Sequence, residues 1–243
     1  MLAQPTATTL VVLIGALQYQ PTLLVCYQNI RLDWYESRNG AGAEGGAGKT
    51  TLALHWAVEA QNGRHSVVII DLDPQASAAS WYRKRKAGTP LLVQTDGAGL
   101  AQALEACRSD DVGTVVIDTS PHGEPPAVMA ARAADLVVIP ARPSVLDLEA
   151  IGTSVQIVET VEKPGVIVLN GCPPRGQVTE QAREALKAYG LQICPVPVIH
   201  RAALAYALVD GRAVTEFEPD GKAAGEIKAT WKWIEKRLEN EVP

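Results

Sequence analysis

Aromatic residues are scarce in this chain of 243 residues, and its cysteines are widely separated. Aromatics make up 5% of it, whereas apolar residues make up 47%. This imbalance disfavours a β-sandwich and favours a core of small aliphatic side chains between parallel strands and helices. The four cysteines form no C-x-x-C pair, and no histidine stands at the spacing of a zinc site. We therefore expect reduced, mostly buried thiols.

The chain also lacks an apolar run of membrane-spanning length and an excess of basic residues. The apolar run from Thr9 to Leu17 has no Lys or Arg before it and ends far short of the roughly 20 residues that a span needs. A buried strand is the preferred interpretation, with a signal peptide as the alternative. The formal charge of −5 means that any contact with nucleic acid must come from a local patch. We expect a cytoplasmic protein that does not bind membranes.

Apolar strand-like runs alternate with helix-like stretches along most of the chain. Each strong run is continuously apolar, as in a parallel strand that is buried on both faces. The strong runs are 66–73, 114–121, 135–143 and 165–171, with weaker ones at 90–95 and 191–196. The alternation predicts an α/β fold, a mostly parallel twisted sheet with helices on both faces in three Rossmann-like layers. Ligands bind such sheets at the carboxyl ends of the strands.

A glycine-rich stretch, "GAGAEGGAGKTT" at residues 40–51, contains the phosphate-binding pattern G-x-x-x-x-G-K-[ST]. In this pattern backbone amides and a helix N-terminus surround the phosphates. Lys49 is expected along the β- and γ-phosphates, and the Thr50 hydroxyl is expected on Mg²⁺. The cofactors predicted are therefore ATP and Mg²⁺, and the nucleotide-binding residues predicted here are Gly45, Gly46, Ala47, Gly48, Lys49, Thr50 and Thr51.

Three acids follow the predicted strands. Asp118 ends the run "TVVI" and is the candidate to hold the metal's water shell, with an N-cap as the alternative role. Asp71 and Asp73 are two residues apart on an extended strand, so they point the same way. One of them can order the metal and the loop while the other holds the attacking water.

Together these segments resemble the ParA-type partition ATPases of the deviant Walker A class, particularly the small ParF-like members without an N-terminal DNA-reading domain. The resemblance covers about residues 44 to 238. It is carried by "GGAGKTTLALHWA", "VVIIDLDPQASAASW", "VVIDTSP", "LVVIPARPSVLDLEA", "VLNGCPPRG" and "DGRAVTEFEPDGKAAGEIKATWKWI". It implies a P-loop NTPase fold and ATP hydrolysis.

The resemblance also implies roles for individual residues. Asp73 matches the acid that positions the hydrolytic water, and we expect it to be catalytic together with Lys49. Asp71 matches an acid that supports the metal and the switch region, and Asp118 matches the acid that holds Mg²⁺ through water, so the predicted metal residues are Thr50, Asp71 and Asp118. Asn170, Pro195 and Val196 resemble positions that contact adenine. Asp147 corresponds to a position near the dimer interface or the nucleotide.

The partners implied are a second copy of the chain, bound in an ATP-dependent homodimer, a ParB-like centromere-binding protein, and nonspecific DNA in a bacterial nucleoid. The residues predicted to contact DNA are Arg201, Arg212, Lys228 and Lys232. A solvated helix face, neutralised by glutamates such as Glu226, is the alternative for these residues.

Two features depart from the family pattern. The family's loop begins with a lysine that touches the partner's phosphates, whereas this chain has Glu44, and a carboxylate there repels a triphosphate. Upstream, "SRNGAGA" replaces the expected buried strand. The central strand must then come from "TLVVLIGAL", "TLLVCY" or "IRLDWY". We expect an atypical leader at 1–43, a foreign or out-of-frame start, and an ATPase domain at 44–243.

The last segment places Ile227, Trp231, Ile234 and Leu238 on one helical stripe. We expect this stripe to pack into the core, and a membrane-surface helix like that of MinD is the alternative. Two other functional hypotheses stay open beside a weakened partition ATPase. One is a non-catalytic nucleotide-binding scaffold or defective product, and the other is a MinD-like membrane-cycling ATPase.

Overall fold

The computed structural model describes residues 22–26, 48–63, 66–120 and 125–240. These residues form a parallel sheet in the order β3-β2-β4-β1-β5-β6-β7. The strands are β1 Thr22–Cys26, β2 Val67–Asp71, β3 Leu91–Gln94, β4 Thr114–Asp118, β5 Leu136–Ala141, β6 Gly165–Leu169 and β7 Gln192–Ile193. The helices are α1 Lys49–Asn62, α2 Ser77–Tyr82, α3 Leu100–Ser109, α4 Pro125–Ala133, α5 Val145–Thr160, α6 Val178–Leu186, α7 Ala202–Val209, α8 Val214–Phe217 and α9 Lys222–Asn240.

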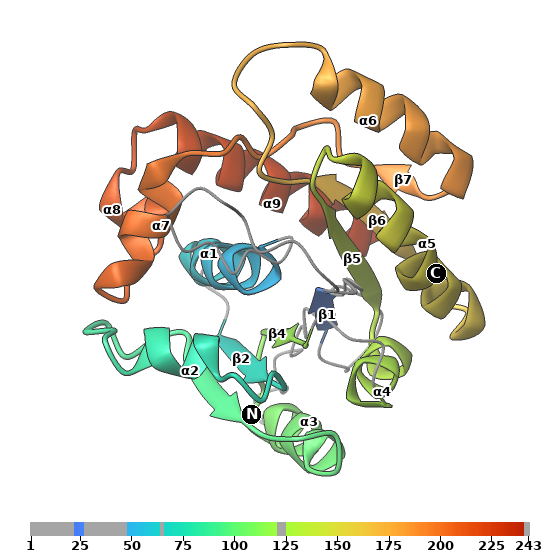
Figure 1. Ribbon diagram of the computed structural model, residues 1–243. Helices are drawn as coiled ribbons and strands as arrows, with labels where there is room; N and C mark the ends of the chain where they lie inside the picture. The colour runs from blue at the N-terminus through green and yellow to red at the C-terminus, as the bar shows by residue number, and fades with distance from the viewer. Residues whose placement is uncertain (1–21, 27–47, 64–65, 121–124, 241–243) are drawn as a thin grey trace.

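The continuously apolar runs form the buried interior of the sheet. Every residue of β2, β4 and β5 is buried, because helices cover both faces (Figure 1). α1 and α9 lie on one face, and α3, α4 and α5 lie on the other. The predicted α/β fold is confirmed, with the strands in parallel register.

The central strand β1 comes from the segment "TLLVC". Thr22–Cys26 pairs with β4 on one side and with β5 on the other. It is one of the three candidates for the missing strand, and the other two lie outside the described residues. The sheet therefore takes its central strand from the part of the chain that the sequence analysis treats as an atypical leader.

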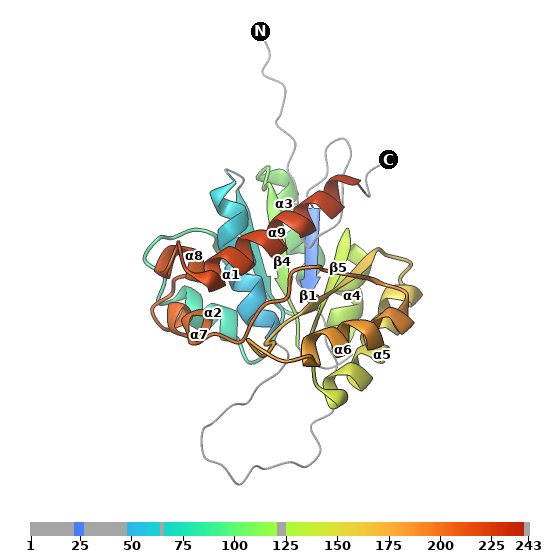
Figure 2. The ribbon, with the colours of Figure 1, turned by 90° about the horizontal axis from the view of Figure 1, so that it is seen from above.

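The apolar stripe of α9 packs into the core, as expected. Ile227 and Ile234 are fully buried, and Trp231 and Leu238 are almost so. α9 crosses α1 (Figure 2), and the Trp56 indole N–H donates to Thr230 Oγ1 at 2.9 Å. The stripe thus contributes to the fold of the described chain and is not a membrane-facing surface.

Three of the four cysteines have described side chains. Cys107, Cys172 and Cys194 are buried, and none of them is in a disulfide. Burial raises the pKa of the Cys107 and Cys194 thiols to about 11. These thiols are unreactive packing residues, as the sequence predicts.

Candidate nucleotide site

Three strands end at the same level at one edge of the sheet. Cys26 pairs in register with Asp118, and Asp118 pairs with Asp71 on the next strand. The Leu72 amide then donates to the Asp118 carbonyl at 2.9 Å. Because the strands are parallel, their carboxyl ends meet here, and the acids predicted from the sequence become neighbours.

The N-terminus of α1 meets this edge. Gly48 precedes the helix with φ of +78°, and no side chain caps the first turn. Lys49 begins the helix and is only 6% exposed. The first turn carries no acidic residue, so its amides and its positive dipole end suit an anion. Gly45, Gly46 and Ala47, like Glu44, lie outside the described residues.

Asp118 is a fully buried carboxylate whose oxygens are unsatisfied. Neither oxygen accepts a hydrogen bond from a described residue. Burial, followed by the charges of Asp71 and Asp73, raises the pKa of Asp118 to about 7, while the nearby Thr50 and Lys49 lower it. Those interactions show that the five predicted side chains gather at one place. The Thr50 hydroxyl is near enough to lower the pKa of Asp118, although neither carboxylate oxygen has a hydrogen bond of normal geometry within the described chain.

The unsatisfied carboxylate of Asp118 fits a magnesium site. Buried oxygens without donors are costly unless a cation or water engages them. Among the described residues, no group of three or more His, Cys, Asp or Glu side chains is arranged to hold a metal. Mg²⁺ needs no such cage, because it binds through one or two protein oxygens, water and substrate phosphates. Thr50 and Asp118 suit that mode of binding.

Asp71 is equally buried, but its oxygens are used by the backbone. One oxygen accepts from the Asp73 amide at 3.1 Å, and the other accepts from the Ala79 amide at 3.0 Å. Burial raises the pKa of Asp71, although these hydrogen bonds oppose the shift. The carboxylate therefore holds the turn between β2 and α2, and its predicted role at the metal stays a prediction.

Asp73 follows at the start of that turn and is half-buried. Its Oδ1 accepts from the Gln75 amide at 3.0 Å. Ala76 then adopts a left-handed conformation with φ of +53° before α2 begins, an arrangement that is strained for a residue with a side chain. Asp73 thus lies at the nucleotide edge and is accessible to water, as the predicted catalytic role requires.

Of the predicted adenine residues, Asn170 lies next to Gly48, the last glycine of the loop. Asn170 is 7% exposed, and its amide nitrogen is 2.5 Å from where a Cβ on Gly48 would stand. Pro195 and Val196 follow the adjacent strand, and the Arg183 guanidinium donates to the Pro195 carbonyl at 3.1 Å. Asn170 is therefore close to Gly48, whereas Pro195 is exposed and its contact with the nucleotide stays a prediction.

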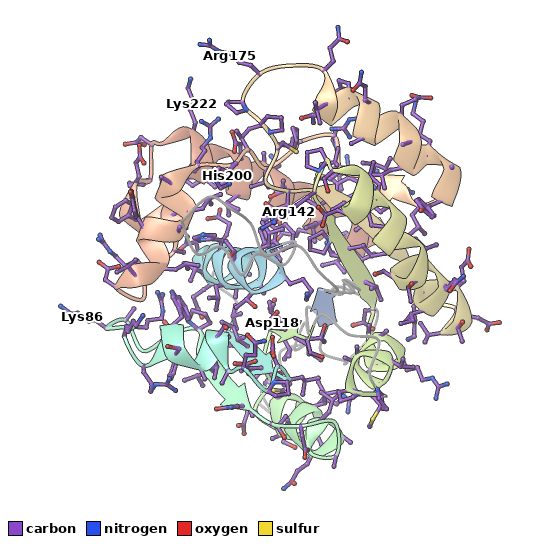
Figure 3. The ribbon with its side chains drawn as sticks, viewed as in Figure 1. Lys86, Asp118, Arg142, Arg175, His200 and Lys222 are labelled. Atoms are coloured by element: carbon purple, nitrogen blue, oxygen red, sulfur yellow. The ribbon has the colours of Figure 1, made fainter. Side chains whose placement is uncertain are left out.

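Arg142 is not among the residues predicted for the site. This residue directly follows β5, and Figure 3 shows it between β5 and α1. Its side chain approaches to 3.8 Å from where a Cβ on Gly171 would stand, and it has no ion pair among the described residues. A basic residue at the end of a central strand is the signal that could have found it. Lys86, Arg175 and Lys222, by contrast, project outward.

Most of the predicted DNA-contacting residues are engaged within the chain. Arg201 pairs with Glu226 at 2.6 Å, and Arg212 pairs with Asp210 at 2.8 Å. Lys228 donates to the Pro219 carbonyl at 3.0 Å. Lys232 is exposed. These contacts fit the alternative of an internally neutralised surface for the two arginines, and DNA contact stays a prediction.

A parallel sheet with a central strand and a glycine-lysine-threonine helix start at its carboxyl edge defines a P-loop nucleotide-binding protein. The family model described as "CobQ/CobB/MinD/ParA nucleotide binding domain" matches residues 41–214. The chain belongs to this family, whose ParA and MinD members are P-loop ATPases. The predicted family and enzyme class are thereby confirmed.

Individual relatives cover most of the chain. It is 31% identical to "Maintenance of carboxysome distribution protein A" of Gloeobacter kilaueensis, over 82% of this chain and 91% of that protein. It is 25% identical to "Protein ParA" of Rhizobium radiobacter, over 67% of this chain and 78% of that protein. MinD of Pyrococcus horikoshii, solved with Mg-ADP, superimposes with a TM-score of 0.68 at 13% identity. The superposition covers 89% of this chain and 97% of that one.

The structure describes nine α-helices. None of those in the described ranges is both long and apolar enough to cross a bilayer.

Proposed function

We propose that this chain is an ATP- and Mg²⁺-dependent positioning ATPase that distributes a cargo inside the cell. In this proposal the ATP-bound chain forms a homodimer that associates with nonspecific DNA, and a cargo-bound ParB-like partner stimulates hydrolysis. Hydrolysis then releases the dimer. The nucleotide state, and not a change of fold, controls where the protein binds.

The observation that carries the proposal is the unsatisfied, fully buried carboxylate of Asp118 beside Thr50 and Lys49. Mg²⁺ would supply charge neutralisation between the phosphates and this carboxylate. Thr50 and Asp118 would hold it, Lys49 would contact the phosphates, and Asp73 would orient the attacking water and accept its proton. The Mg-ADP complex of the archaeal MinD supports the choice of ligand.

ATP turnover tests the proposal directly. We expect slow Mg²⁺-dependent hydrolysis that nonspecific DNA and a cargo adaptor accelerate. Asp73→Ala should bind Mg-ATP with unchanged affinity but hydrolyse it at least about 100-fold more slowly. Calorimetry that detects no Mg-ATP binding by the unaltered chain would overturn the proposal, and equal turnover by Asp73→Ala would remove Asp73 from its role.

Glu44 is proposed to weaken ATP-driven dimerisation. A carboxylate replaces the family's lysine near the partner's phosphates, which exchanges an attraction for a repulsion. Glu44→Lys should raise turnover and the dimer fraction measured with ATP by light scattering. Glu44→Gln removes the charge alone. It should give about half of the gain in the free energy of dimerisation that Glu44→Lys gives. If all three proteins dimerise equally, this account of Glu44 is wrong.

Two cargoes are compatible with the relatives. The ParA likeness favours a plasmid or chromosome, and the 91% coverage of the carboxysome distribution protein favours a protein body. Cells that carry Lys49→Ala distinguish the two. Loss of a replicon over generations indicates a DNA cargo, whereas clustering of a protein body with normal replicon retention indicates a protein cargo.

A further inference from the structure

The segment from Asp73 to Arg85, which contains α2, is attached to the rest of the molecule at both ends. At its start Asp71 accepts hydrogen bonds from the Asp73 and Ala79 amides. At its far end the segment meets α7 and α8, which lie beside it in Figure 1. Between the two attachments Ala76 holds a left-handed conformation. Such a conformation persists only where the surroundings impose it.

The far attachment is a set of charge-assisted contacts, which we name the α2 clamp. The Arg85 guanidinium donates to both oxygens of Glu216, at 2.8 and 2.9 Å, and to the Gly211 carbonyl at 2.9 Å. It also stacks on the ring of Trp81, whose indole N–H donates to the Arg212 carbonyl at 3.1 Å. The Arg85 side chain is only 3% exposed. A bidentate pair at this burial fixes orientation as well as distance.

Gly211 makes this approach possible. It turns between α7 and α8 with φ of +81°, and a Cβ on it would stand 2.4 Å from the Arg85 backbone nitrogen and 2.6 Å from Arg85 Cα. Backbone atoms cannot move aside as a flexible side chain can. A methyl group at residue 211 must therefore push the backbone of Arg85, three residues after the end of α2, away from the turn between α7 and α8.

We propose that Arg85, Glu216 and Gly211 are positioning residues for Asp73, through which α7 and α8 set the geometry of the water-activating segment. The proposal rests on the proposed function, because it assigns hydrolysis to Asp73. α2 is a short helix of six residues, and the clamp and Asp71 together restrain it. Release of the clamp frees the strained turn at Ala76, which shifts Asp73 relative to the phosphates.

The phosphate-binding residues are not part of the clamp. Lys49 and Thr50 belong to α1, and Asp118 belongs to β4. Loss of the clamp should therefore lower the rate of hydrolysis while leaving the affinity for Mg-ATP intact. A generally loosened protein would lose both. This difference separates positioning from a purely structural role.

Two clamp variants and one matched control test the proposal. Gly211→Ala displaces α2 without changing charge, and Arg85→Gln removes the bidentate pair. Gly190→Ala is the control, because Gly190 also has a positive φ of +73° but has no atom within 4 Å of where its Cβ would stand. Turnover, the Kd for Mg-ATP and hydrogen exchange of residues 73–82 are measured well below each protein's melting temperature.

We expect both clamp variants to lose about tenfold or more in kcat, the scale of a misplacement of about 1 Å, with Kd within about twofold of the unaltered protein. Exchange of residues 73–82 should accelerate in both, and Gly190→Ala should change none of the three. Unchanged kcat, or a Kd that rises as kcat falls, overturns the proposal. If the unaltered chain hydrolyses no ATP, the proposed function fails, and unchanged exchange in the clamp variants would then overturn the clamp separately.

Discussion

The nucleotide edge and the C-terminal layer of α7, α8 and α9 treat their carboxylates in opposite ways. At the nucleotide edge Asp118 is fully buried with both oxygens unsatisfied. In the C-terminal layer Glu216 pairs with Arg85 and Glu226 pairs with Arg201, although Thr215 Oγ1 and Arg237 Nε are buried there without hydrogen-bond partners among the described residues. Pairing offsets the desolvation cost of a charged group, whereas a buried carboxylate without a partner weakens the folded state. The contrast locates the ligand at the first region and support for the fold at the second.

The strongest test of this contrast is Asp118→Asn. Removal of a buried charge without donors should raise the free energy of unfolding of the nucleotide-free protein by about 1 to 3 kcal/mol. The same change should lower Mg²⁺-dependent turnover by about 100-fold or more, because the metal loses its carboxylate. Denaturant titration and a turnover assay measure the two effects. Destabilisation by Asn would show that Asp118 serves the fold, and the contrast would fail.

The next largest expected effect is on the pH dependence of stability, and it comes from His55. This residue of α1 contacts the C-terminal layer. Its Nδ1 accepts from the Val214 amide at 3.1 Å, and its Nε2 lies 3.2 Å from the Leu204 carbonyl, to which it donates in this tautomer. Burial lowers the pKa of His55 from 6.5 to about 4, although the Leu204 carbonyl and the charge of Glu216 oppose the shift. The folded chain therefore keeps this ring neutral over a range of pH in which the unfolded chain protonates it.

The sign of the pH effect follows from that difference. Between pH 6.5 and 4 the unfolded chain binds one more proton at this residue, so the free energy of unfolding falls by about 3 kcal/mol as the pH drops through that window. Above pH 6.5 His55 contributes no pH dependence. Denaturant titrations at several pH values give the slope of the free energy of unfolding against pH. In His55→Gln this slope should fall by the equivalent of one proton between pH 6.5 and 4. An unchanged slope would show that His55 titrates normally.

Gly48→Ala is expected to act mainly on the nucleotide. The positive φ costs a residue with a side chain about 1 to 2 kcal/mol, and the new methyl group would displace the Asn170 amide from 2.5 Å. The affinity for ATP should fall about tenfold, as titration calorimetry would show. Gly88→Ala is the control, since Gly88 has φ of +70° in open space. Equal losses of affinity in both would refute a specific role for Gly48.

The smallest expected effect concerns DNA. Lys232→Ala should weaken nonspecific DNA binding uniformly and reduce the salt dependence by about one counterion. Arg201→Gln should instead lower the melting temperature, because it leaves Glu226 without its partner. Fluorescence anisotropy across salt concentrations measures the first, and thermal unfolding the second. If Arg201→Gln alone changes the salt slope, this arginine contacts DNA despite its ion pair.

Much of this structure was predictable from the sequence because its signals are local. The apolar runs at β2, β4, β5 and β6 lie where the periodicity predicts them, and α1 begins at the glycine-lysine-threonine stretch where the phosphate site is predicted. The predicted roles of Asp71 and Asp118 could not be separated in this way. Both are acids at the ends of apolar strands, and only their hydrogen-bond partners differ.

The basic residues near the C-terminus show the same limit. Their density suggests a DNA surface, but the pairing of Arg201 with Glu226 joins residues 25 positions apart. The clamp of Arg85 on Glu216 spans 131 positions, and α8 was not predicted at all. No short window of sequence contains both members of such pairs.

The sequence by itself determined the alternation of strands and helices, the P-loop family and the acids at the strand ends, because each depends on residues that are close together in the chain. Only the tertiary structure decided that Thr22–Cys26 is the central strand, that Asp71 serves the backbone while Asp118 stays unsatisfied, and that α8 binds Arg85 just after α2. These outcomes depend on which donors and acceptors meet after distant segments pack, and that is a property of the folded chain.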